Sequence, residues 1–128
     1  MRILVVGDSC LDTFIYGDID RIAPEAPVPV IKPKYKKDNP GMAANVVANL
    51  KSLGAEVDLI TNSTLIKKIR FVDERYNQMV LRVDENDFCD RINFNDITFE
   101  GESKNLKINN LNLKYINKNY DAIVISDY

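Results

Sequence analysis

The chain has 128 residues, which is the size of one domain or of part of one. Its 17 basic and 19 acidic residues give a net charge of −2, which favours neither nucleic acid nor an anionic membrane as partner. There is no histidine and the two cysteines are isolated, so a Ser–His or Cys–His catalytic pair is excluded and a zinc site is not expected. The sparse cysteines are typical of a reduced cytoplasmic chain, and no apolar run is long enough for a signal peptide or a membrane span.

The first third of the chain predicts three strands. An apolar, β-branched run at residues 3–6 is typical of a strand buried on both faces, as in a parallel sheet. Residues 14–17 and 28–37 also read as strands with turns between them, and the prolines around the second favour an edge position. The Asn-Pro-Gly sequence at 39–41 predicts a turn.

A helix and a second buried strand follow. Apolar residues at helical spacing within 42–55, the last of them Leu53, predict a helix that Gly54 ends, and residues 56–61 predict the strand. With the strand at 3–6 they form a βαβ unit whose first connection carries an insertion, and a right-handed crossover is expected.

The remainder is patterned less evenly. Residues 65–73 and 78–86 predict the two strands of a hairpin. Residues 110–120 form a poor amphipathic pattern that could be a helix, and residues 121–128 predict another buried strand.

This order resembles the ribokinase-like carbohydrate kinases, and among them the heptose 7-phosphate kinases of lipopolysaccharide precursor synthesis. The resemblance lies in "ILVVGDSCLDTFIYGDIDRIAPEAPVPVIK", "NPGMAANVVANLKSLGA", "NQMVLRVDEND" and the terminal "ISDY". The proline-rich "APEAPVPV" separates this branch from other sugar kinases. The similar stretches are spread over nearly the whole chain, but they correspond to less than half of a complete kinase of this kind.

The resemblance implies an α/β fold, a partial parallel-sheet core with a small β-sheet lid at about residues 14–37 and 65–84. In similar kinases this lid covers the sugar and often forms a dimer interface, so a homodimer through the lid strands is expected. Prolines at an exposed edge would restrain unwanted strand pairing there. The alternative is that the prolines only mark an irregular connection.

Two aspartates near the first strand are candidates for binding the sugar. Asp12 follows that strand, on the side of the sheet where open α/β folds bind ligands, and the resemblance implies that it accepts hydrogen bonds from sugar hydroxyls. Asp8 either touches the sugar or only caps the turn after the strand. From the residues alone, Asp12 could equally be a solvated turn aspartate.

Gly41 and Asn45 are the next candidates. Gly41 would let the backbone approach the sugar closely, and the resemblance assigns Asn45 to sugar hydroxyls. Similar kinases carry a second glycine where this chain has Met42, whose side chain is expected to crowd the pocket. The plainer interpretation of Asn45 is an amide on the surface of a helix.

Two basic residues of the second hairpin, Lys68 and Arg70, match basic positions of similar kinases, where a sugar 7-phosphate needs cationic partners. Arg82 is a third cation in this hairpin. The commoner role of such residues is to solvate an exposed sheet face.

The resemblance implies ATP and Mg²⁺ as cofactors, but assigns no catalytic residue and no metal ligand to this chain. The glycine-rich anion hole and the catalytic aspartate of similar kinases lie downstream, and no glycine follows Gly101. The C-terminal nucleotide-binding half is therefore expected to be absent.

Three hypotheses follow from these observations. The chain is the sugar-binding and lid half of a truncated or split heptose 7-phosphate 1-kinase, inactive without a separately encoded C-terminal half. Alternatively, it is a non-catalytic module that binds a sugar phosphate or dimerises, or it is a degenerate remnant.

Overall fold

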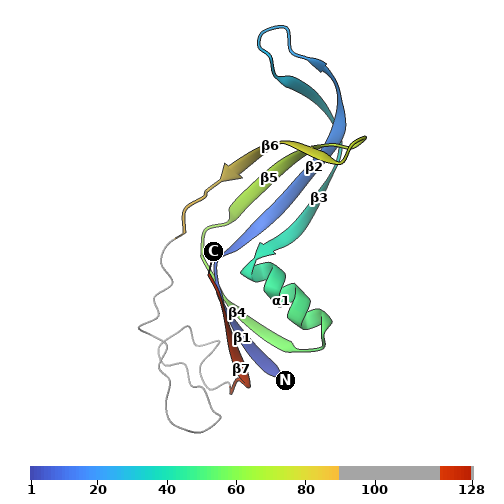
Figure 1. The fold of residues 1–128 in the computed structure, drawn as a ribbon. Helices are drawn as coiled ribbons and strands as arrows, with labels where there is room; N and C mark the ends of the chain where they lie inside the picture. The colour runs from blue at the N-terminus through green and yellow to red at the C-terminus, as the bar shows by residue number, and fades with distance from the viewer. Residues whose placement is uncertain (90–118, 128) are drawn as a thin grey trace. The chain divides into compact units, whose positions relative to one another are not determined.

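The computed structural model describes residues 1–89 and 119–127. Its elements, in chain order, are β1 (Arg2–Gly7), β2 (Ser9–Ile22), β3 (Pro29–Met42), α1 (Ala43–Ser52), β4 (Glu56–Ile60), β5 (Ile66–Asp73), β6 (Gln78–Glu85) and β7 (Ala122–Ser126) (Figure 1). They form two compact units. Unit 1 contains Met1–Ser9, Met42–Ser63 and the described residues within Cys89–Tyr128, and unit 2 contains Cys10–Gly41 and Thr64–Phe88.

Unit 1 is a parallel sheet with one helix. The strand order is β4-β1-β7, and β1 pairs in parallel with both neighbours. The helix α1 connects into β4, so the predicted βαβ unit and the predicted strand near the end of the chain are both confirmed. The expected burial of that last strand is wrong, because β7 is an edge strand of the described sheet and Ile125 is 63% exposed. The expected parallel α/β core is therefore present in this unit.

The central strand β1 is buried on both faces, as its apolar sequence predicts. Ile3 and Val5 pack against Ala43 and Val47 of α1. Leu4 and Val6 point to the other face, where they form a second cluster with Ile60 and Tyr120. Burial of one such aliphatic side chain stabilises the fold by about 1.5–3 kcal/mol, so this short strand anchors the unit.

The helix α1 begins without a side-chain cap, after Met42 with φ 56° and ψ −131°. The N–H of Ala43 instead donates to the carbonyl of Asp8 at 2.8 Å. At the other end, Gly54 has φ 83° and its N–H donates to the carbonyl of Lys51, which confirms the predicted helix stop. Leu53, expected on the apolar face, is 83% exposed because the helix ends at Ser52.

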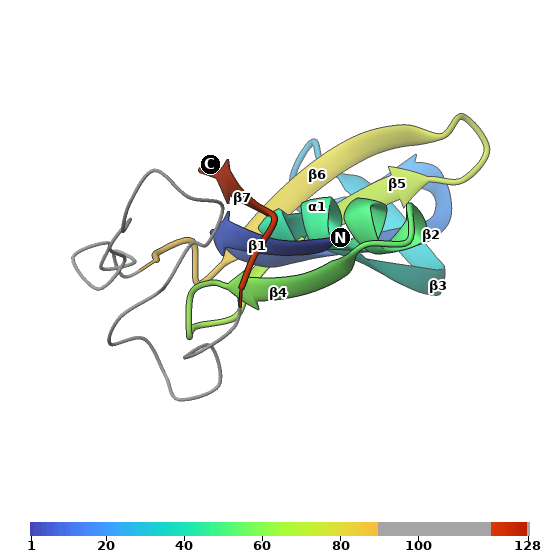
Figure 2. The same ribbon diagram turned by 90° about the horizontal axis from the view of Figure 1, so that it is seen from below.

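Unit 2 is a four-stranded sheet in the order β3-β2-β5-β6, and the views from two sides show its strands beside one another (Figures 1 and 2). The strand β2 pairs with β5 in parallel, and β5 pairs with β6 antiparallel. The predicted hairpin of the second half is therefore confirmed. The strands expected to form the lid lie within this unit.

Two details of the sequence prediction are wrong in unit 2. The strands β2 and β3 each have 14 residues and extend well beyond the predicted segments. The predicted turn at 39–41 belongs to β3 instead. Because β3 is an edge strand of the described sheet, Pro33 and Pro40 can stay within it without removing a bond from a central ladder.

The described residues contain no helix that is both long and apolar enough to cross a membrane. The helix proposed for 110–120 falls almost entirely outside the described residues.

Candidate functional site

A polar face of the unit 2 sheet unites three of the predicted site residues. The parallel register sets Asp12 opposite Lys68 and Phe14 opposite Arg70. Residues paired in this way, and alternate residues along one strand, point to the same side of a sheet. The antiparallel register adds two residues from β6, because Arg82 lies opposite Arg70 and Asp84 lies opposite Lys68.

Asp12 and Arg70 form a half-buried ion pair at the centre of this face. The Nη1 group of Arg70 donates to Oδ1 of Asp12, and the two side chains are 21% and 22% exposed. The guanidinium carbon lies 5.1 Å from the ring centroid of Phe14, which is a cation–π distance. Arg70 is therefore held by a carboxylate and by an aromatic ring.

Gly41 makes room for the carboxylate of Asp12. A Cβ at position 41 would lie 2.5 Å from Oδ2 of Asp12 and 2.5 Å from Sγ of Cys10, which is closer than such atoms can approach. Burial, with a smaller contribution from Asp12, raises the pKa of the Cys10 thiol. A larger residue at position 41 would therefore displace the carboxylate of Asp12 or the thiol of Cys10.

The polar face carries more positive than negative charge. Its cations are Lys68, Arg70 and Arg82, and its carboxylates are Asp12 and Asp84. Arg82 donates from Nε and Nη2 to both oxygens of Asp84 at 2.7 Å, which lowers the pKa of that carboxyl. Lys68 forms no ion pair with the residues that the structure describes. The face therefore suits an anion.

Arg82 and Cys10 were not among the residues that the sequence assigned to the site. The alternation of Arg82 and Asp84 in a predicted strand was a usable signal, because a hairpin must set them beside the preceding strand. Cys10 gave no signal of its own, because its place depends on Gly41, which is distant in the sequence.

The other two candidates, Asp8 and Asn45, lie in unit 1. The carbonyl of Asp8 accepts the first free N–H of α1, and its Oδ1 lies 3.7 Å from Sγ of Cys89. Asn45 is exposed in the first turn of α1. The Asp8 carbonyl thus caps the start of α1, which differs from the cap of the strand-to-loop turn considered from the sequence, and contact of either residue with a sugar stays a prediction.

A hydrogen-bonded cluster joins the carboxyl ends of β1 and β4 in unit 1. Oδ1 of Asn62 accepts the N–H of Ser9 at 2.7 Å, and its Nδ2 donates to the carbonyl of Ser9 at 3.1 Å. The hydroxyl of Thr61 lies 2.8 Å from Oγ of Ser9. These side-chain bonds link the segments that follow β1 and β4, and no pattern in the sequence pointed to them.

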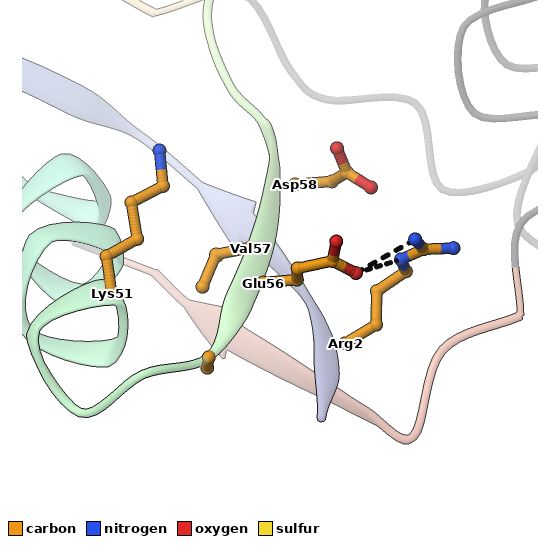
Figure 3. A pocket seen from close by; sticks show the side chains of 6 residues that line it. Arg2, Lys51, Glu56, Val57 and Asp58 are labelled. Atoms are coloured by element: carbon orange, nitrogen blue, oxygen red, sulfur yellow. Dashed lines mark hydrogen bonds and ion pairs between the residues drawn. The ribbon is translucent and has the colours of Figure 1, made fainter.

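A pocket of about 500 Å³ lies at the opposite, amino-terminal ends of β1 and β4 (Figure 3). Its wall includes Arg2 and Glu56, which form an ion pair at 2.8 Å, together with Lys51 and Asp58. Parallel α/β sheets bind their ligands at the carboxyl ends of the strands. This pocket is therefore not the candidate site.

Comparison with known proteins gives an independent view of the chain. Over 59 residues, 46% of the chain, it is 54% identical to the D-beta-D-heptose 7-phosphate kinase of Bordetella bronchiseptica. This part of the chain is similar to the heptose 7-phosphate kinases. Over 82 residues, 64% of the chain, it is 43% identical to the bifunctional protein HldE of Yersinia enterocolitica. The resemblance to heptose 7-phosphate kinases is thereby confirmed for part of the chain.

The chain spans only a minor part of the curated relatives it matches, since these alignments cover 19% and 17% of their lengths. No family model matches it. Among solved structures, a ribokinase from Thermotoga maritima matches 65% of this chain and 35% of its own, with a TM-score of 0.38 and 15% sequence identity. The proposals below rest on the sequence similarity and on the geometry of unit 2.

Proposed function

We propose that the polar face of unit 2 binds a phosphorylated sugar, within a protein of ribokinase-like fold related to the heptose 7-phosphate kinases. The observation that carries this proposal is the placement of Asp12 beside Arg70 and Lys68 on one face of the sheet. A carboxylate is a good acceptor for sugar hydroxyls, and adjacent cations suit a phosphate group. The similarity to heptose 7-phosphate kinases favours heptose 7-phosphate as the ligand.

In this proposal, different residues bind the hydroxyls and the phosphate of the ligand. Asp12 accepts hydrogen bonds from the sugar hydroxyls, while Arg70 and Lys68 bind the phosphate, and Arg70 can do so with two parallel bonds. Gly41 leaves room for the carboxylate of Asp12. Asp8 and Asn45 remain sugar-binding candidates by resemblance.

ATP and Mg²⁺ enter the proposal only through the related kinases. Within residues 1–89 and 119–127, no group of three His, Cys, Asp or Glu side chains is arranged to hold a metal ion. We assign no step of phosphoryl transfer to these residues. The proposed role of the chain is to bind and cover the sugar, in the cytoplasm, where ATP-dependent sugar kinases find their cosubstrate.

Titration calorimetry of the chain with heptose 7-phosphate tests the proposal. Loss of a hydrogen bond from a charged group costs about 1.5–3 kcal/mol. Release of Arg70 from Asp12 offsets part of this loss for the phosphate, so Asp12→Asn should weaken binding several-fold. The matched control is Asp20→Asn, because Asp20 is an exposed aspartate of the same strand. Equal affinities for the wild-type chain and Asp12→Asn would move the site elsewhere.

An apolar groove on unit 2 favours a second candidate function, which is self-association. The groove has a volume of about 390 Å³ and is lined by apolar side chains: Ile19, Val28, Pro29, Ile31, Phe71, Val80 and Leu81. Leu81 is 54% exposed. Exposed apolar patches of this kind often mark protein–protein contacts, and a second copy of the chain is the partner that the resemblance favours.

Analytical ultracentrifugation separates this second function from the first. We expect the chain to dimerise and Leu81→Glu to weaken the dimer, because the new charge would be buried against an apolar partner. Tyr76→Glu is the matched control, since Tyr76 is 75% exposed in the same hairpin but outside the groove. A chain that stays monomeric at high concentration would exclude this candidate.

A further inference from the structure

The two groups that would bind opposite ends of the sugar phosphate bind each other in this structure. Among the described residues, the hydrogen bond of the Arg70 guanidinium goes to Oδ1 of Asp12. The other carboxylate oxygen of Asp12, Oδ2, lies against Gly41. Oδ1, the oxygen farther from Gly41, is therefore the one that Arg70 binds.

We propose that the Asp12–Arg70 ion pair competes internally with the ligand, which makes Arg70 a specificity-determining residue that selects phosphorylated over unphosphorylated sugars. This inference rests on the proposed function. The pair places a carboxylate where the phosphate would bind Arg70, and a guanidinium where the sugar hydroxyls would bind Asp12. A ligand must therefore offer new partners to both Asp12 and Arg70, or its binding loses the free energy of the ion pair.

An unphosphorylated sugar replaces only one partner. Its hydroxyls would take Oδ1 of Asp12 and leave the half-buried guanidinium of Arg70 without an anion. The hydroxyl bond to Asp12 involves one charge where the ion pair involves two, so the exchange gives up the attraction between opposite charges. Burial of an unpaired charge adds to the penalty.

A phosphorylated sugar replaces both partners. Its phosphate offers Arg70 two acceptor oxygens in a geometry that the guanidinium matches, while its hydroxyls bind the released carboxylate. The phosphate also provides an anion for Lys68, which lies opposite Asp12 in the register and forms no ion pair with the described residues. Selectivity then arises mainly from the penalty on the wrong ligand, which is a common origin of specificity.

Calorimetry with three probes tests this mechanism: heptose 7-phosphate, unphosphorylated heptose and inorganic phosphate. Arg70→Gln should weaken binding of heptose 7-phosphate by about tenfold or more, since a charged partner is lost. The same variant should strengthen binding of unphosphorylated heptose several-fold, because Asp12 is released. Asp12→Asn should strengthen binding of inorganic phosphate several-fold, because Arg70 is released.

The controls separate competition from simple structural support. Arg21→Gln removes the same charge from an exposed position of β2 and should leave all three affinities unchanged. Circular dichroism checks the fold of each variant. If Arg70→Gln does not fold, Arg70→Lys keeps the charge without the planar group and should show a reduced preference for the phosphorylated sugar.

Two results would overturn the inference. Arg70→Gln could lower the affinity for both sugars equally, which would make Arg70 a structural support. Inorganic phosphate could bind equally to the wild-type chain and to Asp12→Asn, which would show that Asp12 does not compete for Arg70. If the wild-type chain binds no heptose 7-phosphate, the proposed function fails. The affinities of the wild-type chain and of Asp12→Asn for inorganic phosphate still show whether Asp12 competes for Arg70.

Discussion

Replacement of Met42 by glycine should stabilise the chain. Met42 has φ 56° and ψ −131°, a combination that glycine adopts readily and that a side chain with a Cβ rarely adopts. It also directly precedes α1, at the N-cap position, where glycine is favoured over apolar residues. Glycine is also the residue that the resemblance to sugar kinases implies at this position.

The size of the effect follows from two opposing contributions. Strain in a sparsely populated backbone region costs about 1–3 kcal/mol, and glycine would relieve it. Glycine also gains freedom in the unfolded chain, which costs roughly 0.5–1 kcal/mol. The expected net gain is about 0–2.5 kcal/mol, less the contacts of the half-buried methionine side chain.

Thermal unfolding of Met42→Gly and Met42→Ala isolates the backbone contribution. Both variants lose the side chain beyond Cβ, but alanine retains the Cβ that causes the strain. We expect the glycine variant to melt above the alanine variant by about 3–5 °C for each kcal/mol of strain relieved. Asn77→Gly is a further control, because asparagine tolerates its φ of 50°. An alanine variant as stable as the glycine variant would refute the strain argument.

Three further outcomes are expected. Gly41→Ala should lower the free energy of unfolding by about 1–3 kcal/mol, measured by urea denaturation, because its Cβ would overlap Asp12 and Cys10; an unchanged midpoint would show that both side chains can move away. Cys10 is buried and its thiol pKa is raised, so iodoacetamide should modify it more slowly than Cys89 at pH 8, and equal rates by mass spectrometry would contradict this. The pKa of Asp84 is lowered chiefly by Arg82, so its contribution to stability exists above the ordinary carboxyl pKa of about 3.9 and is lost as the pH falls through the lowered value. The urea midpoint of the wild-type chain should therefore fall below about pH 4 more than that of Asp84→Asn, and parallel pH curves would argue against this pair.

The elements of unit 1 could be predicted from the sequence because their signals are local. A short apolar run is enough to specify β1, and helical spacing followed by Gly54 specifies α1 and its end. The predicted turn at 39–41 failed for a physical reason. Pairing along the 14-residue strand β3 overrides the local turn preference of proline and glycine, and the edge position tolerates the prolines.

The candidate site was also predictable in part: its residues from the sequence, but not their contacts. The sequence identified Asp12, Lys68 and Arg70 as separate candidates, each from its neighbours and from the resemblance. It contained no information that Asp12 and Arg70, 58 residues apart, form an ion pair, although the predicted hairpin already set Arg82 beside Arg70. Only the pairing of β2 with β5 and of β5 with β6 decides which of these side chains share a face. Strand register is a property of two segments together, and a slip by one residue turns every side chain of a strand to the other face.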